Sequence, residues 1–547
     1  MKALTTSFPG VNLSLLSQKL FTARTLTDVG ILRPMRPDKL LRVADALRRW
    51  GPTPAAGYTI STIRHPNQLA IIDELGTLTF ADVHRRTNAL AHALSDAGVK
   101  AGDGIAIMCR NHRGFVDAVV ATSKLGANAL YLNTAFAGPQ ITDVVKREQP
   151  AALIYDAEFE GLTRDAGEGR KRFIAWHDGG EAPKDPLLED LIGAGTPSDV
   201  TPPAEKGRVV ILTSGTTGAP KGAQRKQPES LDPAAALFSK IPLRANERTL
   251  IAAPMFHSWG FVHFTLGMGL GSTLVLRRKF DPEDTLSAVA QHECTALIVV
   301  PVMLQRILEL PAETIDKYDL SALRVIAASG SALPGEMAIK LMDRFGDVLY
   351  NLYGSTEVAW ATIATPEDLR AAPGTAGRPP RGTVVKLLDE KGDEVAPGAT
   401  GRIFVGNEMA FEGYTGGGGK QNVGGLLSSG DVGHFDAAGR LFIDGRDDEM
   451  IVSGGENVFP REVEDLLHDH EAIDEVAVIG VEDEQFGQGL KAFVVRCGGS
   501  SVSEDDLKDY VKANLARYKV LCEIVFLDEL PRNATGKVLK RDLAERG

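Results

Sequence analysis

Glycine, hydroxyl and lysine side chains are concentrated in one short segment, Thr213–Gly222, which reads TSGTTGAPKG. It directly follows the apolar run Val209–Leu212, which is typical of a buried strand. Glycines let the backbone approach an anion, hydroxyl and amide groups donate to phosphate oxygens, and Lys221 adds a positive charge. The segment is not a Walker loop, because Pro220 precedes the lysine and no Ser or Thr follows it. We therefore predict a phosphate-binding loop of another type.

Two acidic side chains stand in turns that suit a nucleotide and its metal ion. Glu357 ends the segment 351–357 (NLYGSTE), beside Thr356. Mg²⁺ usually takes one or two carboxylates and completes its shell with phosphates and water, so this turn suits Mg²⁺. Asp431 ends the turn 429–431 (SGD), where a carboxylate could accept hydrogen bonds from both hydroxyls of a ribose. Taken singly, each acid is more often a solvated loop residue, so the interpretation depends on the segments occurring together.

Two further segments follow, residues 445–457 (GRDDEMIVSGGEN) and residues 531–537 (PRNATGK). Together and in this order, the five segments resemble those of the adenylate-forming superfamily: acyl- and aryl-CoA synthetases, luciferases and the adenylation domains of peptide synthetases. The resemblance extends from Thr77 to Lys537. It implies an ATP-dependent acid–CoA ligase. Such an enzyme forms acyl-AMP and pyrophosphate, then transfers the acyl group to coenzyme A and releases AMP.

The resemblance also implies which residues bind ATP, Mg²⁺ and the reacting groups. Glu357 would bind Mg²⁺, with Thr213 as a second contact. The phosphates would be held by Thr213, Ser214, Gly215, Thr216, Thr217, Gly218 and Lys221. The adenine would contact Gly330, Ser331, Asn351 and Tyr353. The ribose would be held by Asp431 and Arg446.

Four catalytic residues are implied in the same way: Lys537, Glu357, Thr356 and His257. Lys537 would bridge the acyl carboxylate and the α-phosphate, where a cation stabilises the charge that develops on the phosphoryl oxygens, so no protein nucleophile is needed. Thr356 would contact the phosphate. His257 would line the carboxylate end of the acyl pocket; the alternative is a core histidine with its hydrogen bonds satisfied.

The acid is expected to be apolar, with no second carboxylate. The segment 445–458 is most similar to that of medium- to long-chain fatty acyl-CoA synthetases, so a fatty acid is the first expectation. An aryl acid is an alternative. A ligase that loads a carrier protein is another, although the interval between Glu357 and Asp431 shows no obvious insertion; a non-catalytic nucleotide sensor is a third. The apolar residues near His257 that indicate this pocket are Phe256, Trp259, Phe261, Phe264 and Pro301–Leu304.

Apolar runs alternate with helix-period stretches before residue 380, which predicts a parallel α/β sheet. Residues 160–207, rich in Gly, Pro and charged residues, are expected to form surface connections. Short β segments with tight turns follow residue 380, and a compact α+β unit starts at Asp448. The predicted strands include Ile105–Met108, Ala152–Tyr155, Val209–Leu212, Thr249–Ala252, Ala296–Val300 and Arg324–Ala328.

The resemblance implies a large domain of two α/β lobes and a β-barrel, with a small mobile carboxyl-terminal domain. We expect an extension at 1–56, the large domain at 57–447 and the small domain at 448–547. The small domain would rotate about Asp448 between the two half-reactions. Hinges of this kind are a few residues at the ends of secondary-structure elements, which absorb the change in φ and ψ. Gly454 and Gly455 would then line the tunnel for the thiol of coenzyme A.

Composition excludes several other classes of protein. The 547 residues are 43% hydrophobic and 24% charged, which is ordinary for globular domains. A net charge of −12 argues against general nucleic-acid binding. Neither a membrane-spanning run nor a secretory signal is evident, so a cytoplasmic location is expected. The four cysteines are far apart and have no CxxC pair, so neither a disulfide framework nor a zinc site is indicated.

Residues 1–50 differ from the rest in charge, with nine Lys or Arg against three Asp. Residues 38–50 form an amphipathic helix pattern that Gly51-Pro-Thr-Pro54 ends. Such a helix either lies on an anionic membrane, at its inner face, or packs against its own large domain. Both interpretations remain open at the level of sequence.

Overall fold

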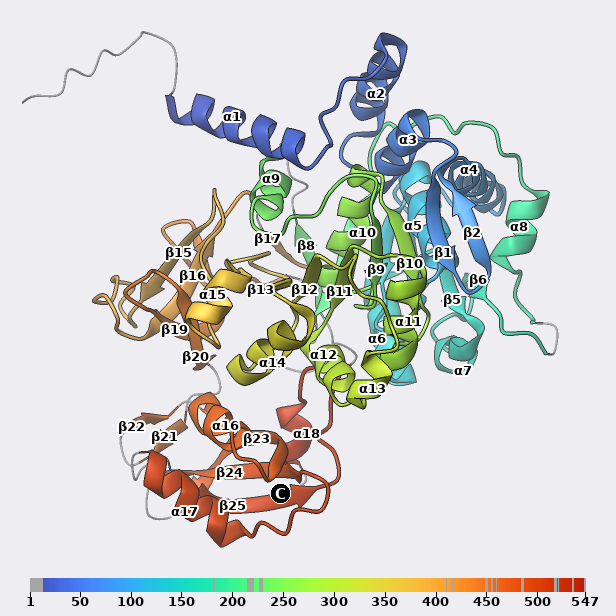
Figure 1. The fold of residues 1–547 in the computed structure, drawn as a ribbon. Coiled ribbons are helices and arrows are strands. Elements are labelled where there is room, and N and C mark those ends of the chain that lie inside the picture. The colour runs from blue at the N-terminus through green and yellow to red at the C-terminus, as the bar shows by residue number, and fades with distance from the viewer. Residues whose placement is uncertain are drawn as a thin grey trace, which may run out of the picture.

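Four β-sheets with helices on their faces make up the chain in the computed structural model (Figure 1). Helices α1 (Leu13–Asp28) and α2 (Pro37–Trp50) lie at one end of the molecule, and the last sheet lies at the other. Within the described chain, no helix combines the length and apolar character needed to cross a bilayer. The described residues are 13–180, 183–213, 221–225, 230–409, 411–415, 417–447, 451–453, 456–458, 460–483, 487–515, 519, 521–533 and 536–545.

The first α/β lobe is built on an eight-stranded sheet whose six central strands are parallel. Its central strands are buried on both faces, as their continuous apolar sequences predict. The two edge strands run antiparallel to their neighbours. In spatial order the strands are β14 (Thr362–Ala364), β13 (Leu349–Tyr353), β12 (Val325–Ala328), β11 (Ala296–Val299), β9 (Arg248–Ile251), β10 (Thr273–Leu276), β1 (Leu69–Asp73) and β2 (Gly76–Thr79).

The second α/β lobe has a seven-stranded sheet, and one of its strands corrects the sequence analysis. Residues 160–207, expected to be surface connections, include β6 (Lys171–Trp176) at the sheet edge and α8 (Leu188–Ala194). Strand β6 begins with the charged residues Lys171 and Arg172, so it lacks the continuous apolar run by which the other strands were predicted. A strand at the edge of a sheet can carry charged residues, because only part of its length is buried. In spatial order the strands are β17 (Phe411–Tyr414), β8 (Lys221–Arg225), β7 (Val209–Thr213), β4 (Asn128–Tyr131), β3 (Gly104–Met108), β5 (Ala152–Asp156) and β6.

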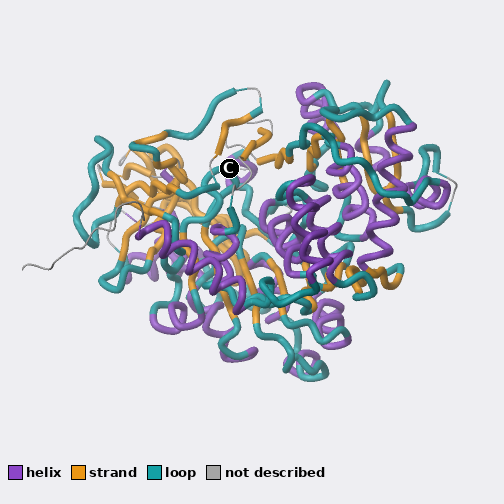
Figure 2. Tube along the Cα trace, turned by 90° about the horizontal axis from the view of Figure 1, so that it is seen from above, coloured by secondary structure: helices purple, strands orange, loops and turns teal. Residues whose placement is uncertain are grey.

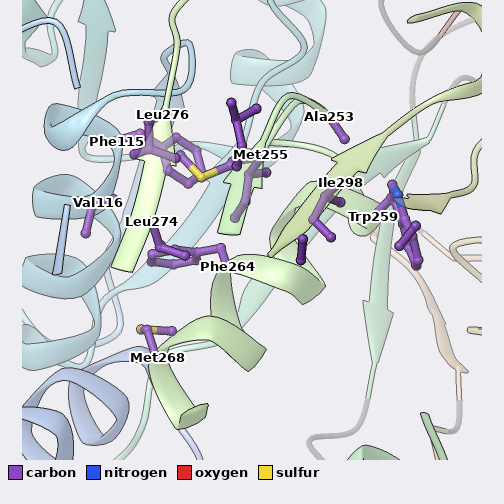
Figure 3. Close-up of a cluster of buried hydrophobic side chains, with 14 of the residues drawn as sticks. Phe115, Val116, Ala253, Met255, Trp259, Phe264, Met268, Leu274, Leu276 and Ile298 are labelled. Atoms are coloured by element: carbon purple, nitrogen blue, oxygen red, sulfur yellow. The ribbon is translucent and has the colours of Figure 1, made fainter. Parts of the chain in front are cut away.

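Helices of the two lobes meet between the sheets and share one hydrophobic core. The Phe115 ring lies 5.5 Å from that of Tyr131 in the second lobe and 6.2 Å from that of Phe264 in the first. Figure 3 shows Phe115, Phe264 and Leu274 gathered in this core. The other helices of the large part are α3 (Pro54–Arg64), α4 (Phe80–Asp96), α5 (Arg113–Leu125), α6 (Gly138–Glu148), α7 (Glu160–Thr163), α9 (Asp232–Phe238), α10 (Ser258–Leu270), α11 (Pro282–Gln291), α12 (Pro301–Leu308), α13 (Ala312–Ile315), α14 (Gly335–Phe345) and α15 (Pro366–Ala371), with a 3₁₀ turn at Ala157–Phe159.

The third sheet is antiparallel and stands where a β-barrel is expected. Figure 2 shows its strands gathered at one side of the molecule, with helices filling the middle. Among the described residues its first and last strands do not pair, so it is an open curved sheet rather than a closed barrel. Its strands are β15 (Val384–Leu388), β16 (Gly401–Gly406), β19 (Leu426–Phe435) and β18 (Asn422–Val423) in order, with β20 (Leu441–Arg446) paired to β19.

The fourth sheet belongs to the small α+β unit at the carboxyl end, which has its own apolar core. The expected helix start at Pro460 is confirmed, and Ser503 and Asp506 form the expected capping box. The predicted domain boundary at 447–448 would fall between β20 and β21, and Asp448 lies outside the described residues. The elements are β21 (Ile451–Ser453), β22 (Glu456–Val458), α16 (Pro460–His468), β23 (Ile473–Asp483), β24 (Gly487–Arg496), α17 (Glu504–Asn514), β25 (Leu521–Leu527) and α18 (Lys540–Ala544).

Candidate active site

A cavity of about 780 Å³ lies between the large part of the chain and the small unit. The carboxyl ends of the parallel strands β9, β11, β12 and β13 open onto it, which is where ligands bind in open α/β sheets. The predicted site residues that line it are Lys221, His257, Gly330, Ser331, Asn351, Tyr353, Thr356, Glu357, Asp431, Arg446 and Lys537.

Several other predicted residues cannot be placed around the cavity. Thr213 ends β7 and pairs with Lys221 of β8, so the predicted phosphate loop joins these two strands. The predictions that lie outside the described residues are Ser214, Gly215, Thr216, Thr217, Gly218, Asp448, Gly454 and Gly455.

Glu357 is only 8% exposed and is held by two hydroxyl groups. The Tyr414 hydroxyl donates to Oε1 at 2.8 Å, and Ser355 Oγ donates to Oε2 at 2.9 Å. Burial and then the neighbouring carboxylate raise the pKa of Tyr414 above its usual range, which keeps the phenol protonated as a donor. Lys221 Nζ lies 5.3 Å from the centre of the Tyr414 ring. Tyr414 therefore connects the strand after the phosphate loop to the predicted metal ligand.

Thr356, next in the same turn, faces the helix that carries the acyl-pocket residues. Its hydroxyl lies 3.1 Å from Ser258 Oγ, at the start of α10. Sequence reasoning missed Ser258, although it directly follows His257.

Asp431 and Arg446 face each other across an antiparallel strand pair. Their Cα atoms are partners between β19 and β20, and Arg446 donates to Asp431 Oδ1 at 3.2 Å. The Tyr353 hydroxyl donates to Oδ2, and burial, followed by this carboxylate, raises the pKa of Tyr353 well above its usual value. These two hydrogen bonds hold the Asp431 carboxylate in a fixed orientation, and a carboxylate retains further acceptor positions for ribose hydroxyls.

Asn351 is one of the predicted adenine contacts, and it is buried, at 8% exposure. Its side-chain oxygen has no hydrogen-bond partner in the described structure, although the residue lines the cavity. A buried acceptor without a partner is costly, so a ligand with an N–H donor would satisfy it. The exocyclic amine of adenine is such a donor.

His257 lies at the start of α10 and lines the cavity, so it is not a histidine enclosed in the core. Burial lowers its pKa to about 4, and the ring is therefore neutral near pH 7. Asn133 Nδ2 lies 3.5 Å from its Nε2, and the Phe256 ring lies 4.6 Å from the imidazole. His257 thus brings no positive charge to the part of the cavity that it lines.

Lys537 reaches the same cavity from the small unit. Asn533 and Lys537 exchange two hydrogen bonds, both 2.9 Å long, which close a tight loop. Gly536 in this loop has φ +78°, and a Cβ placed there would lie 2.3 Å from Val302 Cγ1 of α12. Only glycine allows so close an approach, so Gly536 brings Lys537 against the large part of the chain.

A separate buried cluster, Cys109, His112 and Asp156, has the composition of a metal site. The His112 Nδ1 atom, however, accepts the Gly114 N–H at 3.0 Å, and Nε2 lies 2.8 Å from Asp156. Both ring nitrogens are thus used within the protein. The cluster fixes the start of α5 and does not fit a metal ion.

Family profiles match both parts of the chain. The profile "AMP-binding enzyme" matches residues 61–415, and "AMP-binding enzyme C-terminal domain" matches residues 462–537. The chain belongs to the AMP-binding enzyme family. This places it in the adenylate-forming superfamily and confirms the expected fold class.

Relatives of this AMP-binding enzyme cover almost its whole length. An indoleacetate–CoA ligase of Aromatoleum aromaticum is 33% identical over 88% of this chain and 95% of the relative. A feruloyl-CoA synthase of an Amycolatopsis species is 32% identical over 88% and 96%. The solved o-succinylbenzoate CoA synthetase of Bacillus subtilis, in complex with its acyl-adenylate intermediate, matches with a TM-score of 0.78 and 28% identity over 89% and 97%.

These matches establish the reaction class of the AMP-binding enzyme. It is an AMP-forming acid–thiol ligase that activates a carboxylic acid as an acyl-adenylate. ATP and coenzyme A are its co-substrates. The roles of individual site residues remain predictions, and the cavity supports them by bringing them together.

Proposed function

We propose that this ligase activates an aromatic or similarly compact carboxylic acid and transfers it to coenzyme A. The observation that carries this proposal is that the cavity-lining residues of α10 and α12 are uncharged, while Phe264 and Met268, further along α10, are buried in the core and do not line the cavity. The indoleacetate and feruloyl ligases, which are similar over 88% of this chain, also support an aryl acid. The fatty acid expected first from the sequence is therefore the less favoured substrate.

The acid would lie beside His257, between α10 and α12. Cavity-lining residues from these helices include Trp259, Val262, Pro301 and Val302, and among the described ones none is charged. The described lysine and arginine residues that line the cavity come instead from β8, from the third sheet and its neighbouring loop, and from the small unit. A second carboxylate on the acid would consequently be desolvated without a cation.

Core packing limits the length of the acid. Phe264 and Met268, further along α10, are buried at 0% and 3% exposure, and neither lines the cavity. Figure 3 shows Phe264 packed beside Phe115 and Leu274, with Met268 below them. An extended alkyl chain that continued along α10 would have to displace these side chains, which costs several kcal/mol in a close-packed core, on the order of 1–3 kcal/mol for each overpacked group.

The nucleotide would lie on the other side of His257. Asn351 would accept from the adenine amine, Asp431 would accept from the ribose, and Lys221 would face the terminal phosphates. Glu357, oriented by Tyr414 and Ser355, fits a hard cation because it is a buried carboxylate beside the predicted phosphate site. Bound there, Mg²⁺ would supply positive charge to the phosphates.

Lys537 would act in the adenylation half-reaction. Its ammonium group, brought in by the small unit, would orient the acid carboxylate toward the α-phosphate and stabilise the added phosphoryl charge. The neutral His257 ring would border the acid without competing for this carboxylate. The small unit would then rotate about Asp448, moving Lys537 out and admitting the thiol past Gly454 and Gly455.

Coenzyme A is favoured over a carrier protein as the acceptor. The interval between Glu357 and Asp431 holds β14, α15, strand β17 of the second sheet and strands of the third sheet, without an extra domain-sized segment among its described residues. An insertion in this interval is typical of ligases that load a carrier protein and would hinder rotation of the small unit, so its absence from the described residues supports coenzyme A.

The proposal is tested by pyrophosphate release over a panel of acids, with and without coenzyme A. The panel pairs aryl acids such as indole-3-acetate, ferulate and benzoate with saturated fatty acids of 6 to about 16 carbons. An enzyme discriminates between substrates by their kcat/KM values, so a pocket of limited length should favour the compact acids. We expect the highest kcat/KM for an aryl acid. A kcat/KM that rises steadily to the longest fatty acid would refute the proposed acid class while leaving the ligase reaction intact.

A further inference from the structure

Exposed leucines are concentrated at the amino-terminal end of the molecule. Six of the ten exposed large hydrophobic side chains in the described chain lie between residues 16 and 47. Their exposed fractions range from 45% to 72%. Apolar groups gathered in this way usually mark an interaction surface rather than chance exposure. The six are Leu16, Leu20, Leu32, Leu40, Leu41 and Leu47.

Helix α2 buries only one side of its apolar surface. Ala46 and Trp50 pack with Ala55 and Ala56 of α3, and Ile60, Ile63 and Val200 pack against this cluster, so one side of the helix contacts the large part of the chain. Leu40 and Leu47 are seven residues apart, so they share a helix face, and both point to solvent. The helix therefore has a second apolar stripe, about half of whose surface is exposed.

Positive charge accompanies these leucines. Residues 13–64 contain nine Lys or Arg and three Asp, a net charge of +6, whereas the rest of the chain carries −18. Each Asp is already paired with an arginine close in sequence: Asp28 with Arg24, Asp38 with Arg36, and Asp45 with Arg48.

The remaining cations of this segment are not neutralised. Within the described ranges no carboxylate lies within 4.0 Å of Arg33, Lys39 or Arg42. Lys39 instead donates to the Arg64 carbonyl. The pKa of the neighbouring His65 is lowered, first by burial and then by the positive charges of Arg64, Lys39 and Arg33. These cations therefore lie close enough together to disfavour another positive charge.

We propose that α1 and α2 dock the enzyme onto an anionic lipid bilayer. Leucines on the outward faces would enter the headgroup region while the arginines and lysines contact anionic lipids. A second copy is disfavoured as the occupant, because a symmetric contact would place one +6 surface against another. A helical peptide partner would need a groove, and the active-site cavity takes no lining residue from α1 or α2.

The location of this surface suits an enzyme whose small unit must move. Figure 1 shows α1 and α2 at one end and the small unit at the opposite end. A bilayer bound to the amino-terminal end would leave the small unit free to rotate. The proposal does not depend on which acid the enzyme activates.

Vesicle co-sedimentation of the full chain tests the proposal. The probes are vesicles of phosphatidylcholine alone and of phosphatidylcholine mixed with phosphatidylglycerol. The variant Leu40→Ser/Leu41→Ser/Leu47→Ser removes exposed apolar groups, and Leu75→Ser/Leu162→Ser is the matched control, because both of these leucines are exposed elsewhere on the surface. Thermal unfolding and adenylation of a water-soluble acid check that all proteins are folded.

We expect the unaltered chain to bind the anionic vesicles and to release them as salt is raised. The partition coefficient of the triple variant should fall roughly tenfold or more, while the control variant binds like the unaltered chain. Equal binding by the triple variant, or binding that ignores lipid charge and salt, would overturn the proposal. So would an oligomer of the unaltered chain that the triple variant dissociates, because the surface would then join two copies.

Discussion

The hydroxyl of Tyr414 donates a 2.8 Å hydrogen bond to Oε1 of Glu357, joining strand β17 of one lobe to the loop after β13 of the other. The bond crosses between the two sheets at the cavity. It fixes the orientation of the carboxylate that we propose binds Mg²⁺. Residues that orient a metal ligand in this way commonly affect metal affinity by about 10–100-fold.

Replacement of Tyr414 by Phe removes this bond while keeping the ring beside Lys221. We expect the Mg²⁺ concentration needed for half-maximal adenylation to rise about tenfold. Tyr350→Phe is the control, because Tyr350 belongs to β13, the strand that precedes Glu357, but does not line the cavity. An unchanged Mg²⁺ dependence in Tyr414→Phe would remove Tyr414 from the metal-binding role.

Replacement of Lys537 by Ala should separate the two half-reactions. Without the cation at the α-phosphate, pyrophosphate release from acid and ATP should fall by on the order of 10²–10³. Thioester formation from synthetic acyl-adenylate should persist, and Lys512→Ala, an exposed lysine on α17, should affect neither. Equal losses in both half-reactions would show that Lys537 does not act in adenylation alone.

Gly536 and Gly499 offer a matched pair of substitutions in the small unit. Both have a positive φ, +78° and +85°, but a Cβ at 536 would strike Val302 whereas one at 499 would meet nothing within 4 Å. Gly536→Ala should therefore lower adenylation about tenfold by moving Lys537, while Gly499→Ala causes only the backbone strain of about 1 kcal/mol. Combining Gly536→Ala with Val302→Ala should recover part of the loss. Similar adenylation rates in the two single variants would mean that the close approach at Val302 is unimportant.

Replacement of Asp448 by Pro should have the opposite effect to Lys537→Ala. Proline fixes φ near −65° and would hinder rotation of the small unit. Pyrophosphate release should continue while thioester formation falls, and Asp448→Ala, which keeps backbone freedom, should retain both. If the proline variant performs both half-reactions normally, the hinge lies elsewhere.

Two histidines with a lowered pKa, His257 at the cavity and His263 in the core, should make stability depend on pH. Burial lowers the pKa of both His257 and His263 to about 4, below the unfolded value near 6.5. The unfolded chain therefore binds more protons between these values, and the free energy of unfolding should decrease as pH falls from about 6.5 to about 4. His257→Gln should reduce this slope, leaving the part due to His263. An unchanged slope in denaturant titrations would contradict a buried, neutral His257.

The elements that sequence predicts well are those with continuous apolar runs. The predicted strands near residues 105, 152, 209, 249, 296 and 325 are all present, because buried parallel strands need apolar residues on both faces. Helix α1 was not anticipated, since Ser and Gln interrupt its apolar pattern and its outward face is exposed. Edge strand β6 was missed for a similar reason.

Within the site, the resemblance located the residues that are predicted to contact ATP, Mg²⁺ or the acid, and it missed neighbours such as Tyr414 that orient them. Lys537, Asp431 and Glu357 stand in recognisable segments and do line one cavity. Tyr414 stands in the ordinary sequence FEGY, and only the pairing of β17 with β8 brings it to Glu357. Long-range strand pairing of this kind leaves no local signal.

Direct detection of the acyl-adenylate tests the central claim. The enzyme is mixed with ATP, Mg²⁺ and its best aryl acid without coenzyme A, and the products are identified by mass spectrometry. We predict acyl-AMP and pyrophosphate, followed by conversion of the acyl-AMP to acyl-CoA and AMP when coenzyme A is added. Formation of ADP with an acyl phosphate, or pyrophosphate release that does not require the acid, would contradict the account.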